Sequence, residues 1–348
     1  MKINNTDLII NQLPDCFSLS GQTGKIKKLL SRLPNSTNGI FEFDLIKKQS
    51  PIDYSQAIGK TDEEKQEFIN FVDNQMKRAS KNEQPIGEQL FTFANLWIQG
   101  NHLYHKLIPN IWLEFDNCNI SLPSVYFTLR KKTTRNEQLL LAESILSLFD
   151  YRETMEPALE KIAQCIQYDD AEFPFIQLGL MFPRYDKPVK LVVGPIQINK
   201  ATDLINYLNT KEGIPIPSSF YQDFQNHFVN LSFDINNLSR NAFGLEFIVF
   251  EKDNAEHILS DIENYLVRNN YTTHSNFNEI LNWEASIRPA QTEQFWPDSI
   301  LLDSLSGREF NFPKLEFYVN HFKFCFLNSE ISNVKCYLYY RFTKRTQI

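Results

Sequence analysis

The sequence predicts an α+β fold of repeated helix–β-hairpin units, in which a ten-stranded antiparallel barrel lies inside an outer ring of helices. Pairs of segments that alternate between apolar and polar residues recur five times along the chain. The stretches between these pairs carry apolar residues at helical spacing. Four of the five pairs also separate an apolar face from a polar face in the same way.

Each predicted hairpin consists of two strands. In chain order, the strands span residues 41–46 and 52–57, 111–116 and 125–130, 175–181 and 189–193, 229–235 and 244–250, and 321–326 and 335–341. The first hairpin lies near residues 40–58 and the last near 318–342. Because few stretches read as linkers, we expect one αββα-barrel-like domain over residues 1–348. Two α+β domains joined near residues 150–170 are the alternative.

Helices are predicted between the hairpins. Thr61 and Glu64 have the spacing of a capping box, which begins a helix that continues through Phe71. Apolar spacing predicts further helices over residues 139–148, 155–166, 204–208, 258–266 and 276–283. Residues 288–313 are polar and contain three prolines, so we expect an irregular excursion there.

The two faces of the strands indicate how the layers are arranged. Apolar side chains such as Phe41, Leu113 and Phe324 offer the helices a surface to cover. The opposite faces carry acids, lysines and tyrosines. A closed barrel would enclose these polar faces in a lumen wide enough for a ligand. The alternative is open antiparallel sheets with helices on one face and the polar face in water.

Composition limits the possible partners and compartments. The net charge of -7 gives no general attraction to nucleic acid or to anionic membranes, so we expect neither partner. No apolar run is long enough for a membrane span, and the first residues do not resemble a secretory signal. The five cysteines are scattered without a C-x-x-C motif, which fits a reducing cytoplasm and predicts no structural metal site.

The last predicted strand carries an unusual polar face. Lys335, Tyr337, Tyr339 and Arg341 lie on one side of an extended chain, and the neighbouring strand carries Lys323. Two cations and two phenols on one face could line a cavity that holds an anion. A solvent-facing edge strand protected by charge is the alternative.

This order of elements, over residues 40–342, resembles the αββα-barrel (ABBA) prenyltransferases. The resemblance implies a transferase of secondary metabolism that moves an allylic prenyl group from a diphosphate onto an aromatic, nucleophilic or peptide acceptor. It implies a diphosphate site and cation shield, an acidic residue, Glu114, that orients the acceptor and takes its proton, and an acceptor pocket with Trp112 and Glu246. The residues implied for the diphosphate and the shield are Arg130, Lys190, Lys323, Lys335, Tyr337, Tyr339 and Arg341.

The chain also departs from the family pattern. Lys190 is followed two residues later by Val192 where the family has tyrosine. The acids exceed the family's needs; they could hold Mg²⁺, the only cofactor we consider, or indicate another ligand. The surplus acids are Glu42, Asp44, Asp116, Asp234 and Glu246. Glu114 and Asp116 could equally pair with Arg130 or a lysine.

Two other classes of protein remain as alternatives. A five-fold α/β propeller of the guanidine-modifying type would need a C-terminal catalytic cysteine with a supporting histidine, and the sequence displays neither. A non-catalytic accessory protein that binds a ligand or a peptide would use the same polar face without performing chemistry.

Overall fold

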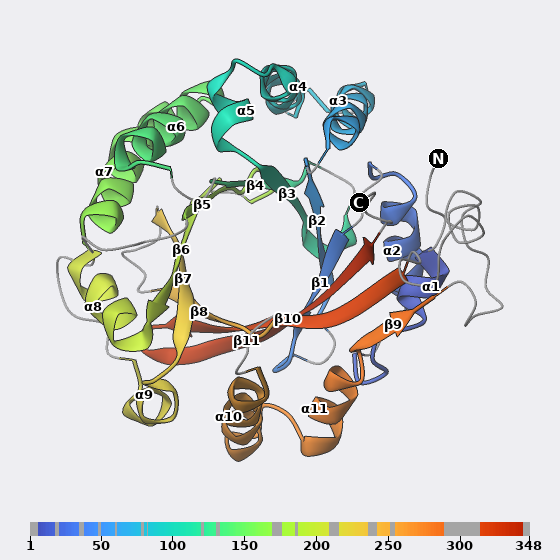
Figure 1. Ribbon diagram of the computed structural model, residues 1–348, viewed down its shortest axis with the longest axis vertical. Helices are drawn as coiled ribbons and strands as arrows, with labels where there is room; N and C mark the ends of the chain where they lie inside the picture. Colours follow the sequence, from blue (N-terminus) through green and yellow to red (C-terminus); the bar gives the residue numbers. More distant parts are fainter. Residues whose placement is uncertain are drawn as a thin grey trace, which may run out of the picture.

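Ten antiparallel strands close a barrel in the computed structural model, and the helices lie outside it (Figure 1). The α+β prediction is therefore confirmed. The structure describes residues 6–17, 21–34, 38–47, 50–59, 61–77, 80–81, 83–119, 122–129, 133–168, 176–184, 187–208, 216–235, 242–250, 255–288 and 314–343.

The barrel follows the chain order from β1 to β8, and β10 and β11 complete the ring. Because β11 pairs with both β1 and β10, and β10 pairs with β8, the sheet closes on itself and the open-sheet alternative is excluded. The strands of the ring are β1 (Asn38–Asp44), β2 (Asp53–Ile58), β3 (Asn110–Phe115), β4 (Ser124–Thr128), β5 (Ile176–Leu180), β6 (Val189–Gln197), β7 (Phe228–Asp234), β8 (Ala242–Ile248), β10 (Lys314–Leu327) and β11 (Glu330–Thr343). The short β9 (Ala285–Ile287) pairs with the start of β10.

The helices occupy the connections between hairpins, as the apolar spacing predicted. Before β1 lie α1 (Thr6–Ile10) and α2 (Thr23–Leu30), and a 3₁₀ turn, η1 (Asp116–Cys118), follows β3. The connecting helices are α3 (Asp62–Met76), α4 (Gln84–Ile98), α5 (Leu103–Leu107), α6 (Arg135–Leu148), α7 (Arg152–Tyr168), α8 (Ile198–Leu208), α9 (Ser218–Phe224), α10 (Ala255–Arg268) and α11 (His274–Leu281). Thr61 caps α3 by accepting a hydrogen bond from the Glu64 N–H at 3.2 Å.

The main core lies between the barrel and the helices. The side chains of Phe41, Leu113, Leu231 and Phe324 point outward from the strands and have 0% exposure. Apolar stripes of the helices pack against them, for example Phe220 of α9, whose ring lies 5.0 Å from that of Phe324. The predicted separation of faces is confirmed, since the polar residues of the same strands point into the barrel.

The last hairpin is longer than predicted, because β10 and β11 each span 14 residues. The register of β10 against β11 shifts between Val319 and His321. This bulge changes the phase of the alternation, so Asn320 and His321 both line the interior. Strict alternation in the sequence therefore predicts a strand that begins only after the bulge, at His321, whereas β10 begins at Lys314. Beyond Arg288, the predicted excursion to residue 313 lies outside the described residues.

Candidate active site in the barrel lumen

The barrel encloses a cavity of about 320 Å³ lined by inward-pointing side chains of its strands. This volume lies within the range of small-molecule sites. Seven of the side chains that the sequence assigned to a site line it: Trp112, Glu114, Lys190, Glu246, Lys323, Lys335 and Tyr337. They come from β3, β6, β8, β10 and β11, so closure of the barrel brings together residues that are more than 200 positions apart.

Two other predicted residues do not line this cavity. Tyr339 and Arg341 lie farther along β11, where a strand advances about 3.3 Å per residue. The Tyr339 hydroxyl donates a hydrogen bond to Asn38 Oδ1 at 3.0 Å, and Arg341 Nε donates to Glu316 Oε2 at 3.0 Å. Arg130 lies outside the described residues.

The lysines of β10 and β11 are paired with carboxylates on the neighbouring strands β8 and β1. Lys323 Nζ lies 3.1 Å from Glu246 Oε1, and Lys335 donates a hydrogen bond to Glu42. The Lys323 and Glu246 side chains are only 10% and 12% exposed. Charges this deeply buried lose much of their hydration, which pairing must offset.

Arg184 provides the pairing on the β3 side of the lumen. Its guanidinium lies 3.1 Å from Glu114 Oε1 and 3.4 Å from Asp116 Oδ1. The sequence left open whether these two acids pair with Arg130 or a lysine; the pairing observed is with an arginine from the connection between β5 and β6. That connection has no alternation that would indicate which of its side chains turns inward.

Lys190 is the most weakly paired cation of this group. Its Nζ lies 3.9 Å from Asp234 Oδ1, beyond hydrogen-bond distance, and Oδ1 has no hydrogen-bond partner among the described residues. Burial, together with repulsion from Lys323 and Arg184, lowers the pKa of Lys190 despite the nearby acids. An anion beside this ammonium would offset both its burial and the repulsion from these two cations.

The three carboxylates that line the cavity differ in their preferred charge. Burial alone would raise the pKa of Glu42, but Lys335 and a hydrogen bond from Tyr337 outweigh it and lower the pKa to about 2. Burial likewise opposes ionisation of Glu246, and Lys323 outweighs it and lowers the pKa. Burial and the Glu42 charge instead raise the pKa of Glu114, against the effects of Lys190 and Arg184. Glu114 is therefore the carboxylate of this set that most readily accepts a proton.

Aromatic rings form one wall of the lumen. Strand register places Trp112 opposite Tyr126, Tyr126 opposite Gly179, and Gly179 opposite Lys190. A Cβ atom at Gly179 would lie 2.7 Å from the Tyr126 ring, so the glycine makes room for that ring to lie across β5. The wall therefore leads from two aromatic faces to the weakly paired ammonium of Lys190.

A histidine and a tyrosine stack on another wall. The rings of His321 and Tyr337 lie 3.8 Å apart between centroids, with planes 17° apart. Burial lowers the pKa of His321 to about 4, despite the attraction of Glu246. The imidazole is therefore neutral near pH 7, and the pair presents an uncharged aromatic surface.

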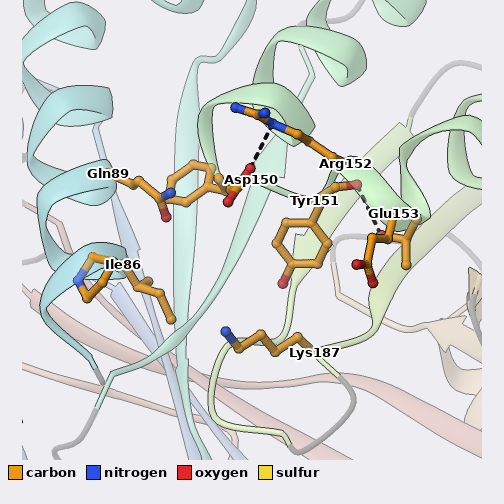
Figure 2. Close-up of a pocket in the computed structure, with 10 residues that line it drawn as sticks. Ile86, Gln89, Asp150, Tyr151, Arg152, Glu153 and Lys187 are labelled. Carbon is orange, nitrogen blue, oxygen red and sulfur yellow. Dashed lines mark hydrogen bonds and ion pairs between the residues drawn. The ribbon is translucent and has the colours of Figure 1, made fainter. Parts of the chain in front are cut away.

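A second cavity, of about 490 Å³, lies outside the barrel between α4 and the start of α7 (Figure 2). Its charged residues are solvated: Asp150 and Arg152 pair with each other at 2.9 Å and are 63% and 84% exposed. The Tyr151 hydroxyl and Gln89 Oε1 are buried there without a hydrogen-bond partner among the described residues. Buried and perturbed charges instead gather in the smaller lumen cavity, which we therefore take as the candidate site.

Comparison with known proteins finds similarity at the level of the whole fold. No protein-family model and no curated protein matches the sequence. The chain is similar to the crystal structure of the prenyltransferase PriB in its apo form, with 11% identity, a TM-score of 0.46, and coverage of 96% of this chain and 94% of that chain. None of the helices that the structure describes has the length and apolar character to span a membrane.

Proposed function

We propose that the chain is a prenyltransferase that uses the barrel lumen to move an allylic prenyl group from a diphosphate onto an aromatic, nucleophilic or peptide acceptor. The observation that carries this proposal is the buried, weakly paired ammonium of Lys190, 3.9 Å from Asp234 Oδ1, in the same cavity lining as the aromatic side chains of Trp112 and Tyr126. An allylic diphosphate combines an anionic head with a tail that becomes a cation, and these neighbouring surfaces suit both parts.

The diphosphate head binds near Lys190 in this proposal, with Lys323 and Arg184 as its nearest cationic neighbours. The described lining residues include four lysines and arginines against three carboxylates, and two further carboxylates, Asp116 and Asp234, lie 3.4 Å from Arg184 and 3.9 Å from Lys190. These cations alone therefore do not balance the negative charge of a diphosphate. Mg²⁺ bound to the phosphate oxygens of the incoming substrate would reduce the difference, with the ionised Glu42 and Glu246 as the carboxylates available to it. When bound, the ion supplies further neutralisation of the leaving group.

The proposed reaction begins when the bond between the allylic carbon and the diphosphate oxygen breaks, and its electron pair leaves with the diphosphate. Lys190 and its cationic neighbours stabilise that leaving group. The faces of Trp112, Tyr126 and Tyr337 shield the allylic cation from water. A carbon, nitrogen or oxygen of the acceptor then forms the new bond to the allylic carbon.

Glu114 takes the proton that the acceptor loses. Its raised pKa favours the protonated product of this step, and the Arg184 guanidinium at 3.1 Å fixes its position. The products are diphosphate, the alkylated acceptor and protonated Glu114, so every bond broken and every charge is accounted for.

A non-catalytic barrel that binds a ligand or a peptide is the second candidate. It is favoured by the pairing of Lys323, Lys335 and Arg184 with carboxylates, because paired charges suit a zwitterionic or neutral ligand as well as an anion. The two candidates differ in whether a covalent product forms.

Turnover measurements test the proposal. Dimethylallyl, geranyl and farnesyl diphosphates are incubated with aromatic and peptide acceptors, and mass spectrometry detects the prenyl mass added to the acceptor. Glu114→Gln is expected to lower the rate by about 10²–10⁴-fold. Glu63→Gln is the matched control, since Glu63 is an exposed acid of α3. If the diphosphates bind without an acceptor but no acceptor of the panel gains a prenyl mass, the result would favour the second candidate. An equal loss of rate in Glu114→Gln and Glu63→Gln would exclude Glu114 from the proposed mechanism.

A further inference from the structure

Two histidines and one aspartate gather on the outside of the barrel. The Nε2 atom of His227 lies 2.8 Å from Asp261 Oδ2, and the Nε2 atom of His257 lies 3.7 Å from the same oxygen. One donor atom from each of the three residues lies within 4.8 Å of the others. The three side chains therefore converge on a volume the size of a single ion.

Two of these residues share one face of α10, because His257 and Asp261 are four positions apart. The third approaches from the turn between α9 and β7. That turn is fixed by its backbone, since the His227 N–H donates to Phe224 O at 2.9 Å and its carbonyl accepts from the Ile198 N–H at 3.2 Å. The side chain of His227 is only 6% exposed, so it is held in place before any ion binds.

We propose that His227, His257 and Asp261 form a Zn²⁺ site. Two imidazole nitrogens and one carboxylate oxygen are ligands that Zn²⁺ prefers, whereas Mg²⁺ prefers oxygen ligands alone. Around a tetrahedral Zn²⁺ with bonds of about 2.0–2.1 Å, donor atoms are separated by about 3.4 Å. The separations of 2.8 Å and 3.7 Å from Asp261 Oδ2 bracket this distance, and the donor atoms of the two histidines lie within 4.8 Å of each other, so side-chain rotations would bring all three donors into place.

The exposure of the ligands defines what the site does. His227 is buried, Asp261 is 27% exposed, and His257 is 73% exposed, so the ion reaches the donors from solvent and a water completes its coordination. The bound ion would add a link between α10 and the turn before β7, which the contact of His227 with Asp261 already joins. This site is independent of the proposed lumen chemistry, because its residues do not line the lumen cavity.

Calorimetric titration of the full-length chain with ZnCl₂, after removal of metals with a chelator, measures this binding directly. We expect one Zn²⁺ per chain and no comparable binding of Mg²⁺. His257→Ala is expected to weaken Zn²⁺ binding by at least about 10-fold. Mutation of a residue that only hydrogen-bonds to a metal ligand already lowers affinity by about this factor, and His257 is itself a ligand in the proposed site. Because His257 is largely exposed, this variant keeps the fold, which its circular dichroism spectrum checks.

His274→Ala is the matched control. His274 Nδ1 also contacts a carboxylate, Glu263 Oε1 at 2.8 Å, but this pair lacks a third donor within the described residues. We expect the control to bind Zn²⁺ as the unmodified chain does, and Co²⁺ to give the visible absorption of a tetrahedral site only where His257 is present. Absence of Zn²⁺ binding in the unmodified chain, or equal affinity in the His257→Ala chain, would overturn the proposal.

Discussion

The buried pair of Lys323 and Glu246 gives a sharp test of the lumen electrostatics. Replacing Lys323 with Met keeps the length of the side chain and removes its charge. Glu246 then loses the cation that lowers its pKa, in a position where its side chain is only 12% exposed. Breaking one half of such a pair costs about 3–5 kcal/mol, because an uncompensated charge stays buried.

The double variant Lys323→Met/Glu246→Leu removes both charges. We expect its free energy of unfolding to return to within about 1 kcal/mol of the original chain or to exceed it, because the hydration that the pair lost on folding no longer has to be offset. Lys77→Met provides the control: Lys77 Nζ pairs with Asp73 at 2.6 Å, but the two side chains are 66% and 42% exposed. Its loss should cost no more than about 0.5 kcal/mol.

Urea unfolding followed by tryptophan fluorescence measures all three variants. The reasoning predicts a large loss for Lys323→Met, recovery in the double variant and almost no change for Lys77→Met. A loss below about 1 kcal/mol for Lys323→Met would mean that water enters the lumen freely and screens the pair. In that case the lumen does not exclude water, as the proposed chemistry requires.

Three further predictions concern substitutions at single positions. Lys190→Met should raise the midpoint of thermal unfolding without ligand, since burial and neighbouring cations disfavour this charge; a lower midpoint would show that Asp234 pairs with it effectively. Gly244→Ala should lower the free energy of unfolding by about 1–3 kcal/mol, because the added Cβ would lie 2.4 Å from Lys323 Cε. Gly24→Ala is the control in the same thermal unfolding experiments: its added Cβ has no atom within 4 Å, so this change should be neutral or stabilising. Burial and Glu42 raise the pKa of Asp53 to about 7, so folding favours the protonated acid and stability falls as pH rises from about 4 to 7. Asp53→Asn should reduce that fall in urea unfolding at acidic and neutral pH, and an unchanged fall would assign it to other groups.

Alternation along the strands made most of the barrel predictable. Residues such as Phe41 and Phe324 face the helices because each strand has one apolar side, and Glu114, Lys323 and Lys335 enter the lumen by the same rule. The rule gives the side of the sheet on which a residue lies, but it does not give the residue's height along the barrel. Arg341 shares a face with Lys335, yet it lies six positions farther along β11 and pairs with Glu316.

Loops and contacts across the barrel were beyond prediction from the sequence. Arg184 reaches Glu114 from a connection without periodicity, so no local pattern indicated it. Glu42 was recognised only as one of several surplus acids, because its pairing with Lys335 depends on barrel closure between β1 and β11. His227 meets His257 only after α9, β7 and α10 have packed, so no local spacing of histidines in the sequence indicated this cluster.

Thermal unfolding with the unreactive substrate analogue geranyl thiolodiphosphate, with and without Mg²⁺, tests the central claim most directly. An analogue present at about 100 times its Kd should add about 2.7 kcal/mol to the free energy of unfolding. The lumen account predicts this stabilisation for the unmodified chain and its loss in Lys190→Met, while the exposed control Lys187→Met keeps it. No stabilisation under either condition, or equal stabilisation in all three chains, would contradict a diphosphate site beside Lys190.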